Sequence, residues 1–291
     1  MTDWDHLFDR AEALVSRLER IFPAPAPEPD WGALAYRWRR DPRGGHLQPV
    51  PDPHRIRASD LKDLEHQVDA LDRNTRQFLA RVPANNALLW GARGTGKSSL
   101  VKAMLNEYAD QGLRLVEVDK TDLMDLPTVV ACLQGRPERF LLFCDDLSFE
   151  ADDPSYKALK AVLDGSVSHA PENVLIYATS NRRHLLPEYM SENRDSRLVE
   201  GELHHGEAVE EKISLSERFG LWLSFHPFRQ DTYLRIVAHW LEQLGLEGPL
   251  DADTRGRALE FALLRGSRSG RVAWQFARDE AGRRALANPA R

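Results

Sequence analysis

The chain has 291 residues, of which 42% are hydrophobic and 29% charged, and its formal net charge is −6. This composition argues against global disorder, and the acidic balance means that any contact with nucleic acid would have to be local. No apolar run approaches the 18 residues of a membrane span, the acidic N-terminus does not resemble a signal peptide, and two cysteines fit a reduced compartment. We therefore expect a cytoplasmic protein without a membrane segment.

The first of three expected regions covers residues 1–50. Residues 5–22 carry apolar side chains at helical spacing, which predicts an amphipathic helix. Residues 23–29 are rich in proline and favour an extended linker. Residues 31–40 are both aromatic and basic. We favour an arm whose rings dock on the main domain, and the alternative is a contact with a partner or nucleic acid.

In the second region, residues 51–227, short apolar runs alternate with helical stretches. This alternation predicts a parallel sheet sandwiched by helices, with ligands at the carboxyl ends of the strands. In the third region, residues 228–291, three helical stretches predict a small all-α lid. The expected strands are 86–90, 114–118, 140–144, 174–178 and 221–225, and the expected lid helices are 232–244, 252–264 and 270–287.

A phosphate-binding loop follows the first expected strand. Residues 91–98 read Gly-Ala-Arg-Gly-Thr-Gly-Lys-Ser, which matches G-x-x-x-x-G-K-[ST] between a strand and a helix. The glycines let backbone N–H groups face an anion at a helix N-terminus. Lys97 supplies charge to the β- and γ-phosphates, and the Ser98 hydroxyl is a ligand for Mg²⁺. The expected nucleotide-binding residues are Gly91, Ala92, Arg93, Gly94, Thr95, Gly96, Lys97, Ser98 and Ser99.

Two acidic residues follow the strand at 140–144. A carboxylate at the end of a buried strand is costly unless a cation or hydrogen-bond donors satisfy it. We therefore expect Asp145 to hold Mg²⁺, directly or through water. Asp146 occupies the position of a carboxylate that orients the attacking water, and Glu150 is the fallback. No Asn-Lys-x-Asp motif for guanine is present, so the expected cofactors are ATP and Mg²⁺.

Polar residues flank two further strands. Asn181 follows the strand at 174–178, where its amide could orient water against the γ-phosphate. Arg218 precedes the last strand, from which it could reach a phosphate held by a neighbouring subunit, although a solvent-facing arginine is the alternative. Between them, residues 186–212 form an acidic segment that is either a partner-contacting element or a solvated loop. His204 and His205 lack a second Cys/His pair, so a zinc site is not expected.

Together these motifs, in this order, resemble those of the AAA+ ATPases over residues 55 to about 285. The resemblance implies that Asn181 is sensor 1, that Arg218 is an arginine finger acting across a subunit boundary, and that Arg271 is sensor 2, with Arg268 a less favoured substitute. It also implies that residues 54–57 lie beside the adenine pocket. The phrases LLWGARGTGKSSLVKA, FCDDLSF, YATSNRRHL and ERFGLWLSF resemble, more narrowly, a bacterial family of predicted AAA+ ATPases with a domain of unknown function.

The resemblance implies an ATPase that forms a homo-oligomer when ATP is bound and that remodels or loads a protein or nucleic-acid client. The superfamily usually has Glu where this chain has Asp146. The alternative is therefore a nucleotide-gated assembly switch with slow or no turnover. The sequence contains no recognised client domain. The residues expected to act in hydrolysis are Lys97, Asp145, Asp146, Asn181 and Arg218, and those expected to hold the metal are Ser98 and Asp145.

Overall fold

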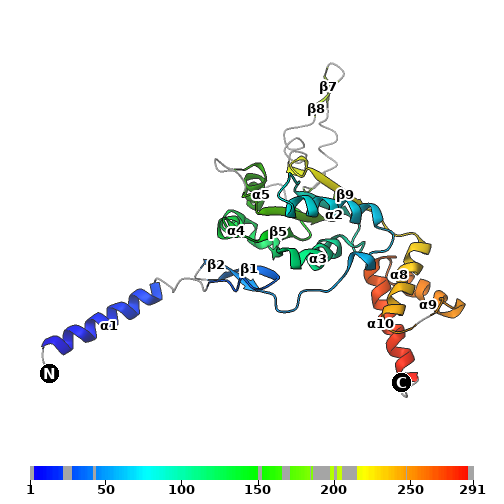
Figure 1. The fold of residues 1–291 in the computed structure, drawn as a ribbon, viewed down its shortest axis with the longest axis horizontal. Coiled ribbons are helices and arrows are strands. Elements are labelled where there is room, and N and C mark those ends of the chain that lie inside the picture. Colours follow the sequence, from blue (N-terminus) through cyan, green and yellow to red (C-terminus); the bar gives the residue numbers. More distant parts are fainter. Residues whose placement is uncertain are drawn as a thin grey trace.

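A seven-stranded sheet forms the centre of the part of the chain that the computed structural model describes (Figure 1). The described residues are 3–21, 28–41, 44–149, 153–165, 171–183, 185, 197–199, 202–204, 215–246 and 248–287.

The strand order is β2-β1-β4-β5-β6-β3-β9, and every neighbouring pair is parallel except β1 and β2. The five strands that the sequence predicts are all present. Strands buried on both faces read as continuous apolar runs, which is why they could be recognised. The strands are β1 (Ala35–Asp41), β2 (Gly44–Pro49), β3 (Ala87–Gly91), β4 (Leu113–Glu117), β5 (Arg139–Cys144), β6 (Val174–Ser180) and β9 (Leu221–Phe225).

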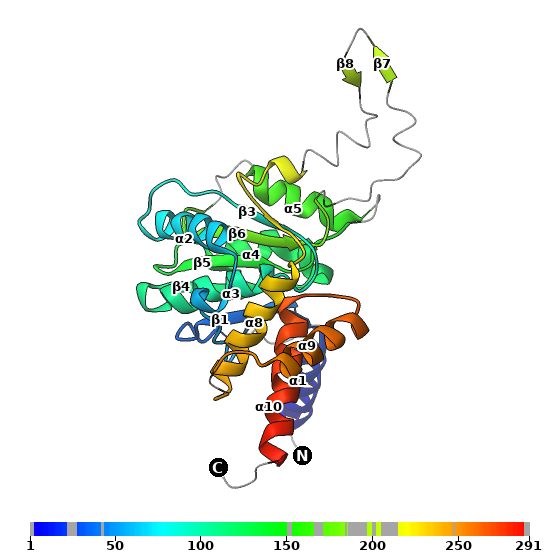
Figure 2. The same ribbon diagram turned by 90° about the vertical axis from the view of Figure 1, so that its right-hand side faces the viewer.

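Helices cover both faces of this sheet (Figure 2). Successive residues of a strand point to opposite faces, so Leu88 and Leu89 of β3 belong to two different hydrophobic clusters. The cluster around Leu89 includes side chains of α2 (Glu65–Leu79) and α3 (Lys97–Tyr108). The cluster around Leu88 includes side chains of α4 (Leu126–Leu133) and α5 (Pro154–Asp164). The α/β sandwich expected from the sequence is therefore confirmed.

The sheet begins earlier in the chain than the sequence analysis expected. Residues 31–40 were expected to be an arm, but most of them form β1, which pairs in parallel with β4 and continues into β2 as a hairpin. Tyr36 and Trp38 are fully buried, as docking rings would be. Two arginines of the same strand pair with acidic residues: Arg37 with Glu117 and Arg40 with Asp125. Whether residues 1–50 form a separate unit stays a prediction.

A helix near the N-terminus and a short hairpin lie outside the seven-stranded sheet. The predicted amphipathic helix is α1 (Asp3–Ile21), which Figure 1 shows projecting from the body of the chain. A short hairpin of β7 (Arg197–Val199) and β8 (Glu202–His204) lies within the acidic segment. Most of that segment, including His205, lies outside the described residues, so its interpretation stays a prediction. No cluster of three or more potential metal ligands occurs among the described residues. No described helix is long and apolar enough to cross a membrane.

The C-terminal helices form a lid with a hydrophobic cluster of its own. They are α8 (Gln230–Gln243), α9 (Ala252–Leu264) and α10 (Gly270–Ala287), close to the predicted bounds. Tyr233 and Val237 of α8 pack with Ala273 and Phe276 of α10. The lid thus has a hydrophobic core separate from those of the sheet, and the loop after β9 connects the two.

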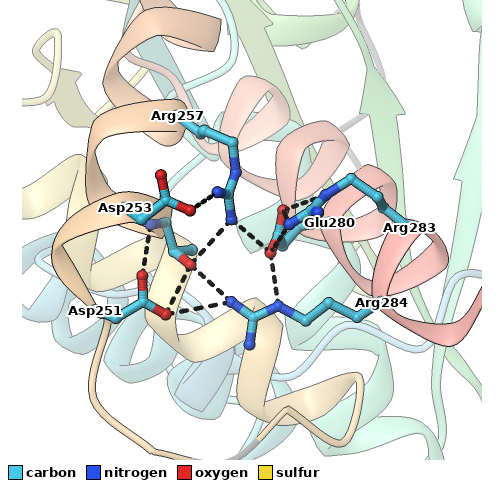
Figure 3. A network of polar contacts seen from close by, with 7 residues as sticks. Asp251, Asp253, Arg257, Glu280, Arg283 and Arg284 are labelled. Atoms are coloured by element: carbon cyan, nitrogen blue, oxygen red, sulfur yellow. Dashed lines mark hydrogen bonds and ion pairs between the residues drawn. The ribbon is translucent and has the colours of Figure 1, made fainter. Parts of the chain in front are cut away.

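One buried carboxylate ties two lid helices together (Figure 3). The Glu280 side chain is only 2% exposed, and it accepts hydrogen bonds from Arg257 of α9 and from Arg283 and Arg284 of α10. Burial alone would raise the pKa of Glu280, but these three guanidinium groups outweigh burial and lower the pKa below its ordinary value of 4.5.

We expect the Glu280→Gln variant to lose about 1–3 kcal/mol of unfolding free energy at neutral pH, because three arginines lose their anionic acceptor. Since the folded-state pKa of Glu280 is lowered, its contribution is fully present above pH 4.5 and is lost as the pH falls through the folded-state value. Urea unfolding at neutral and acid pH measures the loss of unfolding free energy and its pH dependence. The exposed Glu260 of α9 provides the control, Glu260→Gln. A Glu280→Gln variant as stable as this control would contradict the prediction.

Candidate nucleotide-binding site

Positive backbone φ angles shape the loop between β3 and α3. Gly91, Gly94 and Gly96 have φ angles of +134°, +73° and +103°, which favour glycine. A Cβ atom at Gly91 would lie 1.9 Å from the carbonyl oxygen of Phe225 in β9. A Cβ atom at Gly94 would lie 2.8 Å from Ser269, just before α10. The glycine pattern therefore lets this loop curl between the sheet and the lid.

Lys97 lies inside this curl at the first residue of α3. Its side chain is 6% exposed, and Nζ donates to the carbonyl oxygens of Gly91 and Ala92, each at 2.8 Å. Nζ also lies 3.2 Å from Oδ1 of Asn181, which follows β6. Burial lowers the pKa of Lys97, and the negative charges of Asp146 and Asp145 oppose this shift. The loop thus holds its ammonium group among acceptors that an anion could replace.

Ser98 and Asp145, the two residues predicted to hold a metal ion, are hydrogen-bonded to each other. Ser98 Oγ donates to Asp145 Oδ1 at 2.6 Å. The hydroxyl of Thr179 donates to the same carboxylate oxygen at 2.5 Å and accepts from the backbone N–H of Asp146 at 2.8 Å. A hydroxyl and a carboxylate oxygen are hard ligands of the kind that Mg²⁺ takes together with phosphate oxygens and water. These residues therefore fit a Mg²⁺ ion.

Thr179 was not predicted from the sequence, because its place in the site follows from the register of two strands. Cys144 of β5 lies opposite Ala178 of β6. The residues that follow them, Asp145 and Thr179, are therefore neighbours at the carboxyl edge of the sheet.

Asp146 has a backbone conformation that accounts for its residue type. Its φ angle is +53°, in the left-handed region, where Asp and Asn are tolerated better than most other residues. Its Oδ1 accepts a hydrogen bond from Nδ2 of Asn181. A longer side chain such as Glu would be less favourable in this conformation. The fallback residue, Glu150, lies outside the described residues.

Arg218 is paired with an acidic residue outside the cavity lining. It lies in a turn between the buried residues Leu215 and Phe219, and its Nε pairs with the carboxylate of Asp164 at the end of α5. Arg218 is not among the described residues that line the cavity around the phosphate-binding loop. The structure therefore does not bring Arg218 to the loop of its own chain, and its role as a finger between subunits stays a prediction.

The lid touches the phosphate-binding loop directly. The backbone N–H of Gly270 donates to the carbonyl oxygen of Gly94 at 2.8 Å. Arg271, the next residue, lines the same cavity as Lys97, whereas Arg268 is exposed and outside that lining. The geometry therefore favours Arg271 over Arg268 as the lid arginine that faces the loop.

A cavity of about 1290 Å³ joins these groups and is large enough for a nucleoside triphosphate. Its far end lies between residues 54–64 and the lid. There Trp240 and Trp274 pack with ring centroids 4.8 Å apart, and Nε2 of His239 lies 3.1 Å from Oδ1 of Asp60. The sequence resemblance implied that residues 54–57 lie beside the adenine pocket, and this stays a prediction. It did not point to these lid side chains, because nothing local in a helix shows which face meets a distant segment.

The chain is similar to solved structures of two proteins, and the first of them shares this fold. The Orc1 protein of Aeropyrum pernix, solved in complex with DNA, is 17% identical, with a TM-score of 0.53 over 81% of this chain and 63% of that chain. The RuvB Holliday junction branch migration motor of Thermotoga maritima is 13% identical, with a TM-score of 0.47 over 78% of this chain and 64% of that chain. A variant of the same RuvB has a TM-score of 0.49 at 13% identity, over 77% of this chain and 61% of that chain. The chain thus spans about three fifths of the length of these structures, and no curated protein matches it.

The sheet, the loop and the helical lid define the AAA+ fold, as the sequence resemblance implied. Residues 32–284 match the model of one family, described as "Protein of unknown function (DUF815)". Because this match covers most of the chain, the chain belongs to that family. The match begins at Gly32, just before β1, so the family includes the N-terminal hairpin.

Proposed function

We propose that this chain is a Mg²⁺-dependent ATPase that works as a homo-oligomer and uses ATP hydrolysis to remodel or load a protein or nucleic-acid client. One observation carries the proposal. Two hydrogen-bonded groups, Lys97–Asn181–Asp146 and Ser98–Asp145–Thr179, meet at the carboxyl ends of β5 and β6, beside the phosphate-binding loop. They supply a cation, a metal site and a carboxylate within one cavity.

Each residue then has a chemical task. The backbone of the loop and the Lys97 ammonium bind the β- and γ-phosphates. Ser98 and Asp145 would hold Mg²⁺, which neutralises phosphate charge when it is bound. Asp146 and the Asn181 amide orient the attacking water, and Asp146 accepts its proton. Arg271 faces the phosphates from the lid, and a neighbouring subunit supplies Arg218.

One observation favours a second candidate function, a nucleotide-gated assembly switch. Asp146 reaches one methylene less than the usual Glu, and its carboxylate already contacts Asn181 and Arg93. A short and engaged carboxylate favours slow turnover. In this case ATP binding alone would order the assembly.

Asp145 and Asp146 variants test the proposal. Asp145→Ala should lose Mg²⁺-dependent phosphate release, because the metal loses its carboxylate ligand. Asp146→Asn should keep ATP affinity and lose hydrolysis, since Asn tolerates the same left-handed backbone but cannot accept the proton. Phosphate release and calorimetric ATP binding are the two measurements, and Asp110→Asn, at an exposed position of the chain, is the matched control.

The outcomes separate the two functions. A wild-type chain that assembles with ATP yet releases no phosphate supports the switch instead of the ATPase. If Asp146→Asn hydrolyses ATP as fast as the wild type, Asp146 is not the carboxylate that activates water.

A further inference from the structure

The phosphate-binding loop has two charged side chains, those of Lys97 and Arg93. In the proposed function, Arg93 contributes only its backbone N–H to the nucleotide, and its guanidinium has no task. Unlike Lys97, the Arg93 side chain is 78% exposed, so packing does not fix it in place.

The Arg93 side chain closes a line of contacts across the cavity. Lys97 Nζ lies 3.2 Å from Oδ1 of Asn181, and Nδ2 of Asn181 donates to Oδ1 of Asp146. Nη2 of Arg93 lies 3.7 Å from the other oxygen, Oδ2 of Asp146. All four residues line the cavity. Two cations thus stand at opposite ends of an amide and a carboxylate.

The charges at this end of the cavity suit a highly charged anion. Lys97, Arg93 and Arg271 all line the same cavity. Three cations therefore face the same region as two carboxylates, Asp145 and Asp146. Repulsion among the cations is relieved when a phosphate group lies between them.

We infer that the Arg93 side chain binds the terminal phosphate of the nucleoside triphosphate and so discriminates ATP from ADP. This inference rests on the proposed function. When ATP binds, the guanidinium leaves the Asp146 carboxylate and binds the terminal phosphate instead. The exchange is favourable because an exposed ion pair such as Arg93–Asp146, with Asp146 57% exposed, contributes little, whereas charge-assisted hydrogen bonds to phosphate are strong. It also frees the Asp146 carboxylate.

Equilibrium binding of two nucleotides tests this inference without turnover. The ligands are ADP and the non-hydrolysable analogue with an imido bridge between the β- and γ-phosphorus atoms, each measured with Mg²⁺ by calorimetry. Arg93→Ala should weaken the analogue roughly tenfold or more and change ADP affinity by less than about twofold. Arg93→Lys keeps the charge but not the forked geometry, so it should keep part of the preference.

Arg76→Ala is the matched control. Arg76 is an exposed arginine of α2 that pairs with Asp72 and does not line the cavity, so the variant removes the same charge elsewhere. It should leave both affinities unchanged. An unchanged ratio of analogue to ADP affinity in Arg93→Ala would overturn the inference, whether neither affinity changes or both fall by the same factor. If the wild-type chain binds neither nucleotide, the proposed function fails, and the role of Arg93 fails with it.

Discussion

Replacing Arg218 by alanine should lower ATP turnover by a factor of about 10³–10⁵ while each subunit still binds ATP through its own loop. A guanidinium delivered by a neighbouring subunit stabilises charge on the transferring phosphoryl group, and the alanine variant cannot supply it. The turn that carries Arg218 is anchored by the buried residues Leu215 and Phe219, but the substitution also removes the ion pair with Asp164, so thermal unfolding must show that the variant is folded. Phosphate release per subunit, measured against protein concentration, checks this result.

Mixing two inactive variants separates a finger in trans from any other role of Arg218. Arg218→Ala has an intact pocket, and Lys97→Ala has an intact Arg218, so their mixture should recover part of the activity. Arg229→Ala, at an exposed arginine outside the cavity lining, is the control for loss of charge. If activity does not depend on concentration and mixing restores nothing, the finger between subunits is wrong, and the assembly switch becomes the better proposal.

Lys97→Ala should abolish ATP binding or weaken it by about a hundredfold or more, because it removes the buried ammonium of the loop that we propose binds the β- and γ-phosphates. The wild-type ammonium is already held by the carbonyl oxygens of Gly91 and Ala92 and by Asn181, so it is in place before the nucleotide arrives. Calorimetry on the folded variant measures the loss.

Lys102→Ala serves as the comparison for this prediction. Lys102 also lies on α3 but does not line the cavity, so its removal should leave ATP affinity unchanged. Thermal unfolding of both variants shows whether each is folded. Equal ATP affinity in folded Lys97→Ala and the wild type would refute the phosphate-binding role of the loop.

The sequence predicted the parts of the fold that follow local rules. Buried parallel strands are apolar throughout, so β3 to β6 and β9 could be read directly, and the polar residues after them marked the carboxyl edge of the sheet. β1 was missed, although Tyr36 and Trp38 alternate with Arg37 and Arg39 as in a half-buried strand. Its aromatic and basic side chains suggested a docking arm instead, and the acidic partners that neutralise the arginines lie about 80 residues further along the chain.

Other parts of the site depend on tertiary contacts that no local pattern encodes. The ion pair between Arg218 and Asp164 joins residues 54 positions apart, and Asp60 meets His239 across 179 positions. Thr179 contacts Asp145 only because two strands share a register. For such residues the sequence predicts that a polar or charged side chain lies at an edge of the sheet. Which residue it contacts there follows from how whole helices and strands pack.

The hydrogen bond between Gly270 and Gly94 joins the backbones of two glycines that lie close together. A Cβ atom at Gly270 would lie 3.3 Å from the carbonyl oxygen of Gly94. The hydrogen bond attaches the first residue of α10 to the loop that surrounds the phosphates. A helix of 18 residues is about 27 Å long, so a tilt of about 5° at Gly270 would displace its far end by roughly 2 Å. A small rearrangement of the loop around a nucleotide would therefore become a larger displacement at the far end of α10. A neighbouring molecule in contact with the outer surface of the lid would experience that displacement.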